Sequence, residues 1–124
     1  MVLDASAILA YVHDETGSEV VGSAIDGGLV STVNWSEVLQ KAIQLEIDTI
    51  GMRDDFASIG LQFVAFDIAQ AEIAGVIWSQ TRHCGLSLAD RACLALAMHQ
   101  QVAVLTADRA WGDLGLDVDI QLLR

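Results

Sequence analysis

The sequence predicts an α/β fold built around a central, mainly parallel sheet. Short apolar runs of β character alternate along the chain with stretches of helical periodicity, and neither an internal repeat nor a linker interrupts this alternation. A chain of 124 residues has room for one hydrophobic core, and its 53% of hydrophobic residues are ample for it. We therefore expect residues 1–124 to form a single domain.

Short apolar runs predict the strands: residues 2–3, 29–31, 62–66, 102–105 and 118–122. Apolar side chains at helical spacing predict the connecting helices: residues 6–13, 18–25, 35–49, 53–59, 67–81 and 88–100, followed by a helical turn near 110–114. Gly51 is expected to close the long helix that begins at Trp35, and Gly60 to close the helix after it.

The charge of the chain restricts its possible partners. Seventeen Asp and Glu residues face six Lys and Arg residues, which gives a formal net charge of −11. A protein that binds nucleic acid through its own side chains normally carries a basic stripe, and this sequence has none. Either the partner is not a polyanion, or bound cations neutralise some of the carboxylates and then face the polyanion.

Cysteine usage and hydropathy indicate a reduced, soluble protein. Cys84 and Cys93 form no Cys-x-x-Cys pair, and the three histidines show no metal-ligand spacing with them. No apolar run reaches the ~20 residues that span a bilayer, and Asp4 interrupts the apolar start of the chain. We expect a cytoplasmic protein with free thiols and no membrane contact.

Acidic residues recur where predicted strands end and predicted helices begin. Asp4 ends the first strand, Glu37 and Asp90 fall in the first turns of their helices, and Asp108 follows the strand 102–105. In a parallel sheet the carboxyl ends of strands and the starts of the following helices share one edge, where ligand sites collect. We therefore expect these four carboxylates to lie on the same side of the molecule.

Such a cluster needs a countercharge. Two like charges at ~4 Å repel by about 4 kcal/mol at an effective dielectric near 20. Magnesium prefers oxygen ligands and is usually held by one or two carboxylates and several waters. A divalent ion of this kind can activate a water and stabilise charge on a phosphoryl oxygen. It can also bridge an acidic protein to a phosphodiester.

Each acid also has a purely structural interpretation as a helix cap. Segments 34–37 and 87–90 both fit the capping-box template, and Asp4 and Asp108 precede predicted helical turns. Capping explains any one acid, but not why all four occur at a single edge. The two interpretations are compatible, because the helix dipole stabilises a carboxylate at a helix start.

Four segments resemble the motifs of one known family, PIN-domain nucleases, and in particular the VapC toxins of bacterial toxin–antitoxin modules. The segment 2–10 (VLDASAILA) is similar to the family's opening motif, and 34–38 (NWSEV) to its second. The segment 86–97 (LSLADRACLALA) is similar to the third motif, and 104–108 (VLTAD), followed by Trp111, to the fourth. The resemblance covers essentially the whole chain with the motifs in order.

The resemblance implies a PIN-like three-layer α/β/α fold over residues 1–124. It implies a metal-dependent endoribonuclease that uses Mg²⁺ or Mn²⁺ and cleaves RNA, a cognate antitoxin protein as partner, and a homodimer. The implied metal-binding and catalytic residues are Asp4, Glu37, Asp90 and Asp108. Ser6 and Thr106 are implied to support the site by hydrogen bonds, and Asp113 to add a further acid.

Other functions fit the residues less well. A signalling receiver domain needs a lysine after a later strand, and the only lysine, Lys41, lies inside a predicted helix. A phosphatase of the Asp-x-Asp type fails because Ala5 and Ser6 follow Asp4. The remaining alternative is a catalytically inactive PIN-like binding module, although retention of all four acids speaks against it.

The large side chains away from the acids leave two interpretations open. Trp35, Trp78 and Trp111 are candidates for stacking on unpaired bases, but aromatic side chains more often belong to the core. The resemblance implies that the apolar helical surface near Trp35, Leu39 and Ile43 is a candidate for contact with an antitoxin segment or a second toxin subunit. A core position is at least as consistent with their helical spacing.

Overall fold

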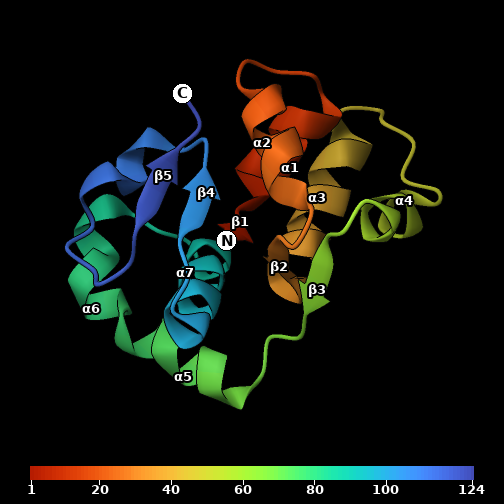
Figure 1. The fold of residues 1–124 in the computed structure, drawn as a ribbon. Helices are drawn as coiled ribbons and strands as arrows, with labels where there is room; N and C mark the ends of the chain where they lie inside the picture. Colours follow the sequence, from red (N-terminus) through yellow and green to blue (C-terminus); the bar gives the residue numbers. More distant parts are fainter.

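The computed structural model describes all residues, 1–124, around one five-stranded sheet (Figure 1). Its strands follow the spatial order β3-β2-β1-β4-β5, and every neighbouring pair is parallel. The sheet is therefore wholly parallel, where the sequence predicted it to be mainly so. The strands are β1 (Val2–Leu3), β2 (Leu29–Ser31), β3 (Gln62–Val64), β4 (Val104–Thr106) and β5 (Ile120–Leu122).

Helices cover both faces of this sheet, so the expected three-layer α/β/α arrangement is confirmed (Figure 1). The first group is α1 (Ala5–Val12), α2 (Ser18–Ile25), α3 (Thr32–Gln44) and α4 (Met52–Ser58). The second group is α5 (Ile68–Val76), α6 (Trp78–Thr81), η1 (Arg82–Cys84), α7 (Leu88–Gln100) and η2 (Arg109–Asp113). None of these helices is long and apolar enough to cross a membrane.

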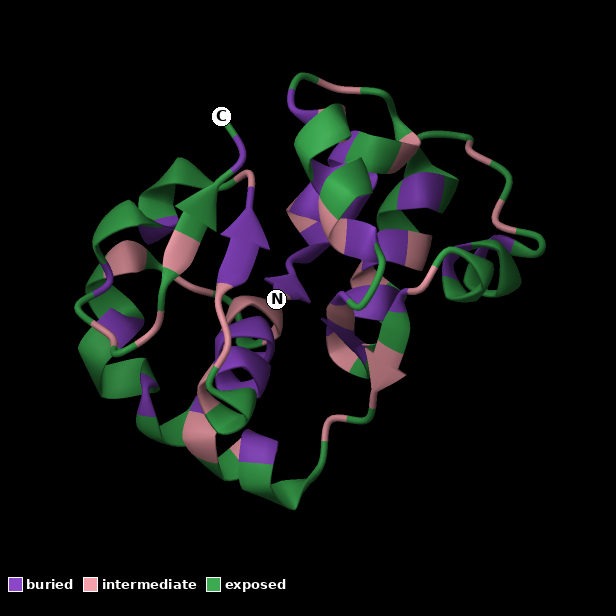
Figure 2. Cartoon of the chain, viewed as in Figure 1, coloured by how far each residue is buried: buried purple, intermediate pink, exposed green.

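Two hydrophobic cores lie on opposite faces of the sheet, because successive strand residues point to opposite sides. Leu3 and Leu105 enter the core beneath the first helix group, whereas their neighbours Val2 and Val104 enter the core beneath the second. The strands β1 and β4 are buried on both faces, as Figure 2 shows in the centre of the molecule. This double burial fixes the position of any residue that directly follows β1 or β4.

The boundaries of α3 differ from the prediction. The helix begins at Thr32, not at Trp35, because the Ser31 hydroxyl caps it by accepting a hydrogen bond from the Val33 N–H at 3.3 Å. It ends at Gln44, since Glu46 adopts a left-handed conformation with φ 60°. Gly51 therefore does not close α3.

The other predicted elements differ by small amounts. Gly51, with φ 76°, instead precedes α4 as its N-cap residue. The predicted helix 67–81 is divided into α5 and α6 at Ile77, and Asp67 caps it by accepting from the Gln70 N–H. Strands β3 and β5 are shorter than predicted, and β4 extends to Thr106, which is fully buried.

Two glycines provide a test of the fold. Gly60 has φ +103°, and a Cβ built there would lie 2.8 Å from Asp26 Cα. We expect Gly60→Ala to lower the free energy of unfolding by more than about 1–2 kcal/mol, the cost of a left-handed L-residue alone. Gly75 lies in α5 with open space around it, so Gly75→Ala should stabilise by up to about 1 kcal/mol. Denaturant unfolding measures both, and equal stabilities would contradict this backbone geometry.

Candidate functional site

The site is built around Asp4, which directly follows β1. Its N–H donates to the Leu105 carbonyl at 3.0 Å, so the ladder between β1 and β4 places Asp4 beside Thr106. Asp4 occupies the N-cap position of α1, yet its side chain makes no capping hydrogen bond. The carboxylate is only 4% exposed and turns to other partners.

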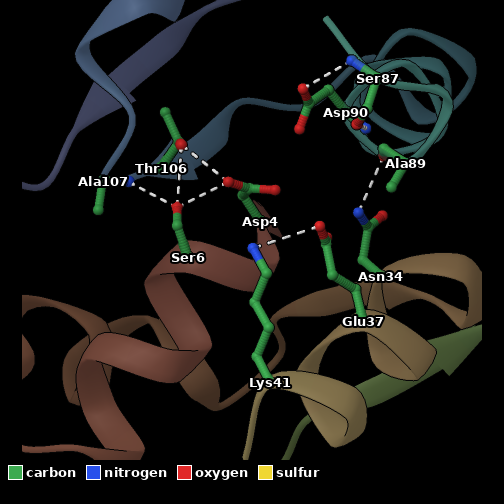
Figure 3. A network of polar contacts seen from close by, with 10 residues as sticks. All are labelled: Asp4, Ser6, Asn34, Glu37, Lys41, Ser87, Ala89, Asp90, Thr106 and Ala107. Carbon is green, nitrogen blue, oxygen red and sulfur yellow. Dashed lines mark hydrogen bonds and ion pairs between the residues drawn. The ribbon is translucent and has the colours of Figure 1, made fainter. Parts of the chain in front are cut away.

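Two hydroxyl groups hold the Asp4 carboxylate (Figure 3). Ser6 Oγ and Thr106 Oγ1 both donate to Asp4 Oδ2, at 2.7 and 2.9 Å. The same hydroxyls accept backbone N–H groups, Ser6 from Ala107 at 3.0 Å and Thr106 from Asp108 at 3.0 Å. Each hydroxyl thus donates to Asp4 and accepts a backbone N–H, and the two hydroxyl oxygens lie 3.2 Å apart. One oxygen of Asp4 is therefore fixed by α1 and the end of β4 together.

Glu37 and Asp90 face Asp4 from two other elements. Figure 3 shows the three carboxylates directed toward a common space. Glu37 lies in the second turn of α3, not in its first turn as predicted, because α3 begins earlier. Asp90 lies in the first turn of α7, where Asp90 Oδ2 accepts from the Ser87 N–H at 2.9 Å and the Ser87 hydroxyl accepts from the Asp90 N–H at 3.1 Å.

A buried amide ties α3 to the start of α7. The Asn34 side chain is fully buried and donates to the Ala89 carbonyl at 2.9 Å. Asn34 lies inside the first turn of α3, whose N-cap is Ser31, so it does not cap the helix as the capping-box pattern of segment 34–37 predicted. This contact bridges the helices that carry Glu37 and Asp90.

The electrostatics show that the three acids interact. Burial raises the pKa of Asp4, the hydrogen bonds from Ser6 and Thr106 lower it, and the negative charges of Asp90 and Glu37 raise it again. The net result is a pKa above the ordinary aspartate value. The unfavourable interaction between the carboxylates is thus a property of the folded site.

Asp108 and Asp113 have different positions. The Asp108 carboxylate is exposed and caps η2 by accepting from the Ala110 N–H at 3.0 Å. Its own N–H donates to Thr106, so Asp108 is connected to Asp4 through that hydroxyl rather than directly. Asp113 ends η2, is exposed, and makes no side-chain hydrogen bond or ion pair. The structure therefore groups Asp4, Glu37 and Asp90. Asp108 is linked to this group only through the Thr106 hydroxyl.

Cys93 and two of the tryptophans belong to the interior, whereas Cys84 is only partly buried. Cys93 is free and fully buried, and burial raises its pKa, as do the negative charges of the site acids. The thiol therefore stays protonated and inert. Trp111 is fully buried, and Trp35 packs edge-on against Phe63 with ring centroids 4.9 Å apart. Trp78 is half exposed, beneath the Arg82 guanidinium.

The donor set fits a hard divalent cation in its chemistry. Asp4 uses only Oδ2 for hydrogen bonds, and Asp90 only Oδ2, so each retains an oxygen for a further ligand. No three His, Cys, Asp or Glu side chains are arranged as a ready-made metal cage. Magnesium commonly uses one or two carboxylates and completes its shell with waters, so the acids present suffice.

One charged group of the site was not singled out in the sequence. Lys41 Nζ lies 3.5 Å from Glu37 Oε2, and the two residues are one helical turn apart on α3. The spacing of four residues between Glu37 and Lys41 was the signal that could have predicted this pair.

Together these features define a parallel α/β protein with an acidic site at the carboxyl edge of its sheet, centred on a buried aspartate. The chain belongs to the PIN-domain family, whose model matches residues 1–115. PIN domains are in general nucleases. No curated protein sequence matches the chain significantly.

Solved structures with low sequence identity share the fold. A toxin–antitoxin complex from Klebsiella pneumoniae superimposes with a TM-score of 0.78 at 14% identity, covering 99% of this chain and 97% of the other. A DNA-bound VapBC from Salmonella typhimurium gives 0.74 at 16% identity, with 99% and 97% coverage. FitAcB from Neisseria gonorrhoeae gives 0.73 at 18% identity, with 98% and 96% coverage.

The raised pKa of Asp4 predicts how stability depends on pH. A carboxyl whose folded pKa is raised contributes stability that is present below its ordinary pKa, about 4, and is lost as pH rises through the folded value. Asp4→Asn removes this ionisation and keeps an acceptor for Ser6 and Thr106. In EDTA, the variant should therefore melt at a higher temperature than wild type at pH 7.

The difference between the two proteins should shrink as the pH falls toward 4. Asp54→Asn is the matched control, because the Asp54 side chain is 84% exposed and its loss should leave the melting temperature almost unchanged. A lower melting temperature for Asp4→Asn than for wild type at pH 7 would contradict a raised pKa of Asp4 in the folded protein.

Proposed function

We propose that this protein is a metal-dependent endoribonuclease and the toxin of a toxin–antitoxin pair. The observation that carries the proposal is the arrangement around Asp4: one oxygen is held by Ser6 and Thr106, and the other side of the carboxylate faces Glu37 and Asp90. Membership of the PIN-domain family and the fold shared with toxin–antitoxin complexes support it.

The acidity of the protein supports a cation-mediated mode of substrate binding. The net charge is −11, and five of the six basic side chains are engaged away from the site acids. A polyanionic substrate therefore needs a bound cation as its bridge to Asp4 and its neighbours. Mg²⁺ or Mn²⁺ would be held by Asp4, Glu37 and Asp90, with Asp108 completing the set.

In this proposal the residues around the site have separate roles. A bound divalent ion supplies Lewis-acid stabilisation of phosphoryl oxygens and an activated water. Ser6 and Thr106 orient Asp4, and the capping box at Ser87 orients Asp90. Asp113 is exposed and far less constrained, so we assign it a supporting role near Asp108.

None of the three histidines forms a hydrogen bond or ion pair with a site acid, which bears on the products of cleavage. His83 is exposed in η1. His13 is at the surface, 3.6 Å from Glu15, and His99 lies in the last turn of α7, at the opposite end of that helix from Asp90. Activation of the ribose 2′-hydroxyl commonly requires a histidine or similar acid–base pair. We therefore expect water to be the nucleophile.

The first test is cleavage of RNA by the purified protein. With Mg²⁺ or Mn²⁺ the wild type should cut total RNA and leave 5′-phosphate and 3′-hydroxyl ends, and EDTA should abolish the cutting. Asp4→Asn and Asp90→Asn should each lower the rate by about a hundredfold or more, the scale on which electrostatic groups act in active sites. Asp54→Asn should remain active. Cyclic 2′,3′-phosphate ends, or full activity in EDTA, would contradict the mechanism.

An apolar groove supports a protein partner. It has a volume of about 430 Å³ between the end of α1 and α4, and Tyr11, Met52 and Phe56 are among its lining residues. Ile50 is 88% exposed beside it, and Asp48 and Asp55 add negative charge to the lining. An antitoxin segment with an apolar helix and basic side chains matches these features.

A homodimer is part of the same proposal. Ile68 and Val76 on α5 are each 74% exposed, and Trp78 on α6 is 50% exposed. All three side chains belong to the second helix group, away from the groove beside α4. Exposed apolar side chains in this group are the candidates for contact between two copies of the chain.

The second test is toxicity in a bacterium. Expression of the wild type alone should arrest growth, whereas Asp4→Asn at the same protein level should not. Co-expression with the product of a neighbouring antitoxin gene should relieve the arrest. Equal arrest by wild type and Asp4→Asn would show that toxicity does not arise from this site, and would favour an inactive PIN-like binding module.

A further inference from the structure

Lys41 is the only basic side chain placed within the group of site acids. Its ammonium lies 3.5 Å from the Glu37 carboxylate, and Figure 3 shows the side chain extending from α3 toward the space that the carboxylates face. The Lys41 side chain is 48% exposed and that of Glu37 only 22%, so the pair stands at the mouth of the site.

The five arginines of the chain are all engaged elsewhere. Arg91, the sequence neighbour of Asp90, turns away from the site and donates to the Ala74 carbonyl at 2.8 Å. The other arginines contact groups outside the site: Arg53 contacts Asp54, Arg82 covers Trp78, Arg109 donates to the Arg124 carbonyl, and Arg124 pairs with Glu15. Lys41 is therefore the only side-chain cation available to compensate the repulsion among the site acids.

The pairing of Glu37 also bears on metal binding. Asp4, Glu37 and Asp90 share one space, yet no three acidic side chains are arranged as a metal cage. One of the three acids, Glu37, is bound to an ammonium group instead. Lys41 contacts only Oε2 of Glu37, so binding of a cation by both oxygens of Glu37 requires that this ion pair separate. The nearby positive charge of Lys41 also opposes the arrival of a second cation.

We propose that Lys41 is a built-in countercation: it pairs with Glu37 in the metal-free protein and opposes full coordination of a divalent cation by that carboxylate. This inference rests on the proposed metal-dependent function. Lys41 is a positioning residue, since it acts through Glu37 and through its charge. Lys41 stabilises the metal-free protein and weakens its affinity for a metal ion. Removing Lys41 should therefore lower the stability of the metal-free protein and raise its metal affinity.

The test compares Lys41→Met with Arg53→Met, which makes the same change in net charge at an exposed pair away from the site. Calorimetric titration with Mn²⁺ at low ionic strength should show about three- to tenfold tighter binding for Lys41→Met than for wild type. Arg53→Met and the conservative Lys41→Arg should bind as wild type does. In EDTA, Lys41→Met should melt at a lower temperature than Arg53→Met.

Two further measurements separate this role from a merely structural one. The gain in Mn²⁺ affinity should decline as salt is added, because screening weakens the effect of the Lys41 charge. The gain in Mn²⁺ affinity from Lys41→Met should also be smaller when Glu37→Gln is present, because Lys41 then has no carboxylate to hold. A gain independent of salt and of Glu37 would overturn the inference.

The outcomes distinguish this inference from the proposed function. If wild type binds Mn²⁺ and Lys41→Met binds it no more tightly, the countercation role is wrong while the metal site stands. If only Lys41→Met binds, the role of Lys41 is supported and the wild-type site is shown to be self-blocked. If neither protein binds Mn²⁺, both the metal-dependent function and the inference fall.

Discussion

The position of every other group in the site depends on the burial of one carboxylate. Asp4 is 4% exposed at the point where two fully buried strands end, so it has almost no contact with water. An unsatisfied buried carboxylate is strongly destabilising. The structure meets this cost with two hydroxyl donors, Ser6 and Thr106, and each hydroxyl is in turn fixed by a backbone N–H. The start of α1 and the end of β4 are thereby locked to the same oxygen.

The surrounding helices add negative charge to this point. Glu37 and Asp90 both raise the pKa of Asp4, so the site is electrostatically unfavourable as it stands. The Asn34 amide, bonded to the Ala89 carbonyl, keeps α3 and α7 close despite this repulsion. A fold that maintains such an arrangement loses stability at neutral pH, as is common where perturbed carboxylates gather at a functional site.

Much of the fold could be predicted from the sequence because its signals are local. Alternation of apolar runs predicted the parallel sheet. The bounds of α2 agree with its periodicity, and those of α7 with its periodicity and its capping box at Ser87. The boundaries of α3 were wrong because the decisive groups, the Ser31 cap and the left-handed Glu46, carry weak local signals. The prediction that strand ends and helix starts gather acids at one edge agrees with the positions of Asp4 and Asp90 in the structure.

By itself, therefore, the sequence determined the order of the elements and the type of residue at the ends of β1 and β4. Only the tertiary structure decided how those residues are used. The Asp4 carboxylate does not cap α1, since Thr106, 102 residues further along the chain, lies beside it in the sheet. Asn34 does not cap α3, because the helix begins earlier, at Thr32, and the Asn34 amide instead donates to the start of α7. Local spacing encodes helix periodicity and caps, whereas the partner of a buried polar group is set by packing between distant segments.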